Sequence, residues 1–249
     1  MRQTMRQKIY LIPGTMCHER LWSDFLPSLV HALGDNYEFI HVKIPRDKCF
    51  SELSSYLNDY FIQEQVIIIG FSLGGYIASH FATTFPQRVS KVFVIANSPC
   101  ILPLAEQRQR QEIVEFVNCF GYKGMSSNRA AQLFDCQQSL DNGTCNGDQL
   151  KDFIEIMVSM DAELGSVEFE SQIRCTTKRI DLFEKLASGP VPFVFYYSKY
   201  DVLMNIKWLN KLEKASDNCV MICTPGASHM LPLEKPKELA GHIYTWLNT

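Results

Sequence analysis

Residues 66–75 read VIIIGFSLGG, and this stretch decides the fold. A run of apolar residues ends at a glycine, and a pattern typical of a helix follows Ser72. A serine between a buried strand and a helix sits in a strained turn, so the residues two before and two after it must be small, as Gly70 and Gly74 are. The G-x-S-x-G pattern predicts that Ser72 is a nucleophile at the carboxyl-terminal edge of a sheet. The alternative interpretation is a turn between strand and helix that cradles a phosphate or is merely tight.

Short apolar runs and helical patterns alternate on both sides of this stretch. The runs are rich in β-branched and aromatic residues, which suits strands buried on both faces of a parallel sheet. Alternation with helices indicates βαβ units, so the sequence predicts an α/β fold with a mostly parallel central sheet and helices on both faces. The expected strands lie at 8–12, 38–42, 66–69, 91–96, 193–197 and 220–224, and the expected helices at 22–33, 51–61, 73–85, 205–215 and 236–247.

The interval 102–186 interrupts this alternation. It contains no convincing strand, and apolar residues recur at helical spacing in 105–120, 128–134, 149–160 and 180–186. Turn signals lie at 141–143 and 146–147. We expect residues 102–186 to form a helical lid inserted into a core made of residues 1–101 and 187–249.

A serine hydroxyl needs a base and an acid to become a nucleophile. His229 follows the expected strand 220–224 in a flexible loop, whereas four other histidines fall in expected helices or strands. Asp201 follows the expected strand 193–197, and the other plausible place, 97–100, offers no carboxylate. The sequence therefore predicts a catalytic triad of Ser72, His229 as general base and Asp201 as its orienting acid. A helix N-cap is the alternative role for Asp201.

The negative oxygen that develops during acyl transfer needs two backbone N–H donors. One is expected from Leu73, the residue after the nucleophile. The other is expected from the loop after the first strand, where Thr15 is favoured over Met16. Trp22 either covers the substrate pocket or packs in the core.

Composition limits the classes of partner. Of the 249 residues, 46% are hydrophobic, and 24 basic against 27 acidic residues give a formal net charge of −3. This balance disfavours a broad surface for nucleic acid or for an anionic membrane, so a small-molecule substrate is expected. The stretch 106–112 contains Arg108 and Arg110. We interpret it as a solvated helix face or, alternatively, as a surface patch that binds an acidic carrier.

Nine cysteines occur without zinc-ligand spacing, so we expect neither a metal nor another cofactor. We interpret the cysteines as mostly small core residues of a reduced, cytoplasmic protein. The apolar run 9–12 near the N-terminus is too short for a signal-peptide core or a membrane span.

Five segments together carry a family resemblance: 11–15 (LIPGT), 70–75 (GFSLGG), 200–201 (YD), 228–229 (SH) and 233–236 (LEKP). With them the chain resembles the α/β-hydrolase fold superfamily, in its branch with a serine nucleophile and a small helical cap. Residues 96–100 (ANSPC) and the Ser-Leu-Gly-Gly elbow resemble the pimeloyl-carrier-protein methyl ester esterases. The usual His-Gly of the first loop is Pro13-Gly14 here, which leaves the shape of the pocket open.

These patterns predict a serine hydrolase that cleaves a carboxylic ester or a thioester through an acyl-enzyme intermediate. An acyl-carrier substrate is one form that this ester could take. The resemblance also allows a lyase or a C–C hydrolase with the same triad, and a non-catalytic binding protein that kept the fold is the third alternative. Apolar lid residues face either an acyl chain or the core: Phe116, Phe120, Met125, Phe134, Met157 and Met160.

Overall fold

A computed structural model describes residues 6–135 and 147–249 of the chain. Its centre is a six-stranded sheet in the order β2-β1-β3-β4-β5-β6, and every neighbouring pair is parallel. The predicted fold class is confirmed, and the expected strands agree with the observed ones to within two residues at each end. The strands are β1 (Gln7–Ile12), β2 (Tyr37–His41), β3 (Val66–Phe71), β4 (Val89–Ile95), β5 (Phe193–Ser198) and β6 (Cys219–Thr224).

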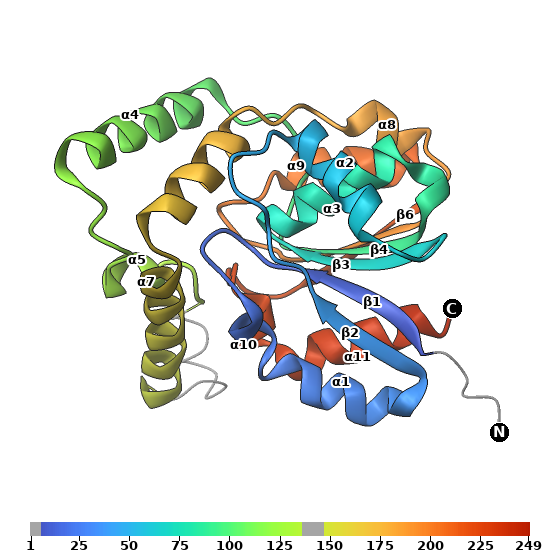
Figure 1. Cartoon of the computed structure of the whole chain (residues 1–249). Coiled ribbons are helices and arrows are strands. Elements are labelled where there is room, and N and C mark those ends of the chain that lie inside the picture. The colour runs from blue at the N-terminus through green and yellow to red at the C-terminus, as the bar shows by residue number, and fades with distance from the viewer. Residues whose placement is uncertain (1–5, 136–146) are drawn as a thin grey trace.

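Helices cover both faces of the sheet because alternate strand residues point to opposite sides. On one face, Ile67 and Ile69 join a buried cluster with α1 (Phe25–Leu33) and α11 (Pro236–Leu247). On the other, Val66 and Ile68 pack with a second set of helices. That set consists of α2 (Phe50–Tyr60), α3 (Leu73–Thr84), α8 (Phe183–Ala187) and α9 (Ile206–Ala215), and Figure 1 shows the two layers.

The strand order reverses between β1 and β3. The chain leaves β1 for the sheet edge at β2 and returns to β3 on the other side of β1. In such sheets the crevice at the carboxyl ends of the diverging strands is the usual place for a ligand. Here that crevice lies between the loop after β1 and the turn after β3, which contains Ser72.

A helical insertion separates β4 from β5, as expected. It contains α4 (Leu104–Phe120), α5 (Ser127–Ala131), α7 (Gly147–Thr177) and then α8, and Figure 1 shows α4, α5 and α7 on one side of the core. The helix expected at 149–160 runs on to 177, with a break at Gly165, where φ is 74°. The turn signal at 141–143 lies outside the described residues. The domain limits at 101/102 and 186/187 stay predictions, and we call residues 102–186 the lid.

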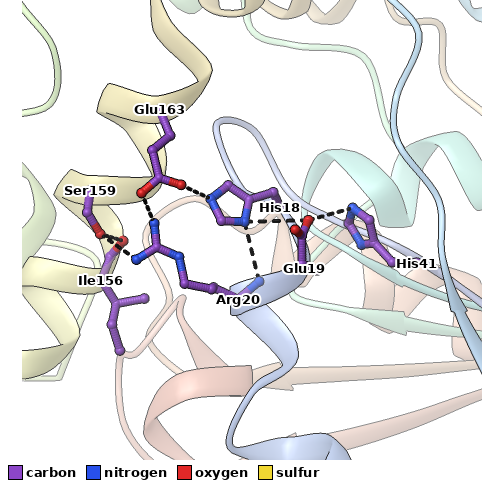
Figure 2. A network of polar contacts seen from close by, with 7 residues as sticks. All are labelled: His18, Glu19, Arg20, His41, Ile156, Ser159 and Glu163. Atoms are coloured by element: carbon purple, nitrogen blue, oxygen red, sulfur yellow. Dashed lines mark hydrogen bonds and ion pairs between the residues drawn. The ribbon is translucent and has the colours of Figure 1, made fainter.

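The first half of α7 is tied to the core by a polar network (Figure 2). Glu163 accepts hydrogen bonds from Arg20 and from His18, the latter with Nε2 and Oε2 3.1 Å apart. Arg20 also donates to Ser159 Oγ over 3.1 Å. Glu19 lies between His18 and His41 on the core side of this network. The network therefore fixes the lid to the segment that follows β1.

No helix in the described parts of the chain is long and apolar enough to cross a membrane. Among the seven cysteines described, only three are buried: Cys17, Cys100 and Cys219. The interpretation of the cysteines as mostly core residues is therefore wrong for the described set. The other four are partly or fully exposed.

Candidate active site

Ser72 occupies a strained turn between β3 and α3. Its φ is 49° and its ψ is −115°, a conformation that L-residues adopt at a cost of about 1–3 kcal/mol. The two glycines permit this turn: a Cβ on Gly70 would lie 2.4 Å from the Gly74 carbonyl oxygen, and one on Gly74 would lie 2.1 Å from that of Ile12. The backbone N–H of Ser72 donates to Ile95 across 2.8 Å, which secures the turn to β4.

The structure brings Ser72, His229 and Asp201 together, although up to 157 positions separate them in the chain. The His229 Nε2 atom is 3.0 Å from Ser72 Oγ, and His229 Nδ1 is 2.7 Å from Asp201 Oδ2. Asp201 and His229 are buried, and Ser72 is partly exposed. With Nδ1–H donating to the carboxylate, Nε2 is left as an acceptor for the serine proton.

Two loops after neighbouring strands position the acid and the histidine. Asp201 follows β5, and its second oxygen, Oδ1, accepts the N–H of Leu203 at 2.9 Å. The loop of His229 follows β6 and is joined to the end of β5 by a hydrogen bond from Ser198 Oγ to the Ser228 carbonyl, 2.6 Å long. The backbone N–H of His229 donates to the carbonyl of Leu133 in the lid over 2.8 Å. Core and lid together therefore hold the imidazole.

A cavity of about 630 Å³ opens at this point between the core and the lid. Ser72 and His229 line its floor, and Thr15 and Met16 line one wall. Both apolar and polar side chains of the lid line the cavity. Apolar side chains there include Ile113, Met125, Leu133, Met157 and Ile173, and polar ones include Glu106, Arg110, Tyr122, Arg129 and Asp161.

Buried polar groups shape the wall on the lid side. Asp161 is almost fully buried and accepts hydrogen bonds from the Tyr122 hydroxyl, at 2.5 Å, and from the Met125 N–H, at 2.8 Å. Burial, and then this carboxylate, raise the pKa of the Tyr122 phenol. Burial, with Asp161 as the second cause, also raises the pKa of Cys17 to about 12. The Cys17 thiol in the cavity wall is therefore protonated at neutral pH and is a poor nucleophile.

The expected oxyanion donors differ in how they are used. The N–H groups of Thr15 and Leu73 donate to no acceptor in the described part of the chain. The Met16 N–H instead donates to Gln172 Oε1 of the lid, 2.8 Å away. Of the three expected donors, the Met16 N–H is therefore the one already occupied by a side chain of the lid.

Trp22 does not contact the cavity, so the expectation of a substrate contact is corrected. Its side chain is 1% exposed, belongs to the core cluster and packs against Phe25 with ring centroids 6.1 Å apart. Trp22 is the last residue of the 3-10 helix Glu19–Trp22, in which Leu21 is also buried. Of the six apolar lid residues, only Met125 and Met157 line the cavity. Phe134 and Met160 are buried in the core, and Phe116 and Phe120 are exposed.

Sequence reasoning missed three contributors from the lid. These are Gln172, Asp161 and the carbonyl of Leu133. The carbonyl has no sequence signal, because any residue supplies one. The other two are polar residues inside a helix, which read as solvent-facing until a partner is known. Within the described ranges, no group of three or more His, Cys, Asp or Glu side chains could hold a metal ion, and the expectation of no cofactor stays a prediction.

Comparison with known proteins supports the fold class. A family described as alpha/beta hydrolase fold matches residues 46–118. The chain is 27% identical over 251 aligned residues to a pimeloyl-[acyl-carrier protein] methyl ester esterase of Pectobacterium carotovorum, covering 94% of this chain and 92% of that protein. It is 24% identical to a biotin biosynthesis bifunctional protein of Teredinibacter turnerae, of which it spans only 45%.

A thermophilic esterase of Thermogutta terrifontis superimposes with a TM-score of 0.77 at 16% identity, covering 97% of this chain and 89% of the esterase. At that identity, the likeness supports the fold alone. The predicted resemblance to the superfamily and to the methyl ester esterases is confirmed by these matches. The name of the Pectobacterium relative also agrees with the predicted class of enzyme, a hydrolase that acts on ester bonds.

Proposed function

From the α/β-hydrolase fold of this chain, we propose that it is a serine hydrolase of carboxylic esters or thioesters. The observation that carries the proposal is the continuous hydrogen-bonded chain from Asp201 through His229 to Ser72, with contacts of 2.7 and 3.0 Å. This series of hydrogen bonds ends at Ser72, which lines a cavity large enough for a substrate. A role as a mere binding protein would require neither the three side chains nor their alignment.

The reaction proceeds in two halves. Ser72 Oγ attacks the carbonyl carbon while His229 Nε2 takes the hydroxyl proton, and Asp201 stabilises the imidazolium. The N–H groups of Thr15 and Leu73 bind the negative oxygen of the tetrahedral intermediate. His229 then gives its proton to the leaving alcohol or thiol, which leaves an acyl ester on Ser72. Water, deprotonated by His229, attacks this ester, and its collapse releases the acid and restores the serine.

The cavity supports an acyl group with both apolar and polar portions. Met125 and Met157 offer flexible apolar surface, whereas Arg110 and Arg129 bring positive charge into the same wall. Arg110 is held by Glu106 and by Thr176 Oγ1, the latter at 2.7 Å, so it is part of the wall and not only a solvated helix face. The name of the Pectobacterium relative suggests a methyl ester of a carrier-borne acyl chain as the first substrate to test.

The proposal is tested with short p-nitrophenyl esters and a fluorophosphonate probe. We expect labelling at Ser72, and its loss together with turnover in Ser72→Ala, while Ser188→Ala, at an exposed serine, behaves as wild type. Asp201→Asn should remain folded and lose roughly 10⁴-fold in kcat, because the histidine then takes the wrong tautomer. Undiminished esterase activity in Ser72→Ala would refute the proposal. Labelling without any ester or thioester cleavage would favour the lyase alternative.

A further inference from the structure

Gln172 is a buried lid residue that contacts the loop over the nucleophile. It lies in the second half of α7, residues 166–177, and is 4% exposed. Its Oε1 accepts the backbone N–H of Met16 over 2.8 Å. This hydrogen bond joins the lid to the main chain of residues 13–17, which we call the oxyanion loop.

The oxyanion loop is a tight turn in an unfavourable conformation. Cys17 N–H donates to the Gly14 carbonyl at 3.2 Å, so Thr15 and Met16 are the central residues of the turn. Met16 has a φ of 54°, which costs a side-chain-bearing residue free energy unless its surroundings impose it. The loop also runs very close to the nucleophile, since a Cβ on Gly14 would lie 3.3 Å from Ser72 Cβ. A small rotation in this turn would therefore move the Thr15 N–H relative to Ser72.

The orientation of the Gln172 amide is itself fixed from behind. Its Nε2 donates to Glu168 Oε1 at 2.7 Å, and Glu168 Oε2 accepts from Arg46 Nε at 2.7 Å. The Glu168 side chain is 3% exposed, and its carboxylate can only accept. A flipped amide would set N–H against N–H at Met16 and oxygen against oxygen at Glu168. Oε1 is thereby directed at Met16.

We propose that Gln172 is a positioning residue for catalysis: by holding the Met16 N–H it fixes the oxyanion loop, so that the Thr15 N–H stays directed at the oxygen formed when Ser72 attacks. This inference rests on the proposed function of Ser72. It gives a role in transition-state binding to the series of hydrogen bonds that runs from Arg46 through Glu168 and Gln172 to Met16. The same contact could instead be inhibitory, a role that we call the plug. In that role Gln172 occupies the Met16 N–H, which the substrate would otherwise use as a hydrogen-bond donor.

The test replaces the amide with a side chain of similar length and no hydrogen bonds, Gln172→Met. We expect kcat for p-nitrophenyl esters to fall about 10-fold with KM within twofold of wild type, because ground-state contacts are kept and the oxyanion donor is misplaced. Inhibition by a trifluoromethyl ketone, which forms the tetrahedral adduct, should weaken by a similar factor. Gln111→Met, the same change at an exposed glutamine of α4, should leave all three values unchanged.

A second measurement starts from the wild-type protein and depends neither on the folding of Gln172→Met nor on activity. In the wild-type protein, the Met16 amide should exchange with deuterium at least 10-fold more slowly than the Thr15 amide, as read by NMR. Gln172→Asn, whose amide is one methylene too short to reach both partners, should lose that difference. A folded Gln172→Met with unchanged kcat, or Met16 exchange as fast as that of Thr15, overturns the positioning role, and a raised kcat assigns the plug instead. Failure of the wild type to label at Ser72 overturns the proposed function and with it the catalytic role of Gln172, and slow Met16 exchange would then show only that Gln172 holds the loop.

Discussion

Replacing Gly74 by alanine should both destabilise the protein and disable the site. The added methyl group would lie 2.1 Å from the carbonyl oxygen of Ile12 and 2.5 Å from that of Pro13. These are backbone atoms at the end of β1 and in the oxyanion loop, so no side chain can rotate away. The two segments must separate by about 0.9 Å to reach 3.0 Å, below which Cβ contacts essentially never occur.

The magnitude follows from two opposing effects. Alanine in place of glycine in a helix gains about 1 kcal/mol, whereas overpacking costs about 1–3 kcal/mol at most sites and about 4 kcal/mol here, where the backbone must move. We expect a net loss of about 3 kcal/mol in the free energy of unfolding. For a chain of this length that is roughly 6–12 °C in Tm. Because the oxyanion loop moves by nearly 1 Å relative to Ser72, kcat should fall by about 10²-fold.

Gly241 provides the matched control. It lies exposed in α11, and a Cβ built there would meet nothing within 4 Å. Gly241→Ala should therefore raise the free energy of unfolding by up to about 1 kcal/mol through helix propensity. Both variants are compared by urea unfolding, followed by circular dichroism, and by p-nitrophenyl ester turnover. If Gly74→Ala kept its Tm within 3 °C of wild type and its full activity, the close approach of the turn to β1 could not be as described.

Two further predictions concern buried titratable groups. Burial, followed by the nearby Lys185 cation, lowers the pKa of His80 from 6.5 to about 4, so the unfolded chain takes up a proton that the folded one resists. The free energy of unfolding, measured with urea, should therefore fall by about 2 kcal/mol between pH 7 and pH 4.5. In His80→Asn this dependence on pH should be weaker. An equal dependence in both proteins would contradict the lowered pKa of His80. N-ethylmaleimide at pH 8, followed by peptide mass spectrometry, should label the exposed thiols of the native protein rapidly and Cys17 only after unfolding, whereas equal rates would show that Cys17 is accessible. The exposed thiols are Cys49, Cys119 and Cys223.

The parts of the fold that could be predicted are those specified locally. The elbow at Ser72 needs small neighbours and a strand before it, and all of these are adjacent in sequence. The strands are recognisable because burial on both faces leaves continuous apolar runs, as in β3. The positions of Asp201 and His229 follow from strand order, because loops at the same edge of a parallel sheet converge.

The second half of α7 could not be predicted for a physical reason. Its inward side carries Glu168, Ser171 and Gln172, which are buried because they bond to Arg46, Asp47 and Met16 from the core. A polar inward side removes the hydrophobic periodicity by which an amphipathic helix is recognised in a sequence. In addition, Gly165 suggests that the helix ends there. Trp22 could not be placed for a different reason. A tryptophan suits both a substrate pocket and a hydrophobic core, and only the packing of the folded protein shows that this one lies in the core.

The lid therefore contributes more to the site than a cover over the substrate. Its Leu133 carbonyl accepts the His229 N–H, and its Gln172 accepts the Met16 N–H, so it holds both the base and the oxyanion loop from the side opposite the sheet. The core supplies Ser72 and Asp201, the proposed nucleophile and acid, after β3 and β5. Each of these two lid contacts satisfies a backbone N–H for which the core offers no acceptor among the described residues. Under the proposed function, the geometry for acyl transfer thus depends on contacts between core and lid, and we expect Gln172, which does not line the cavity, to affect the rate.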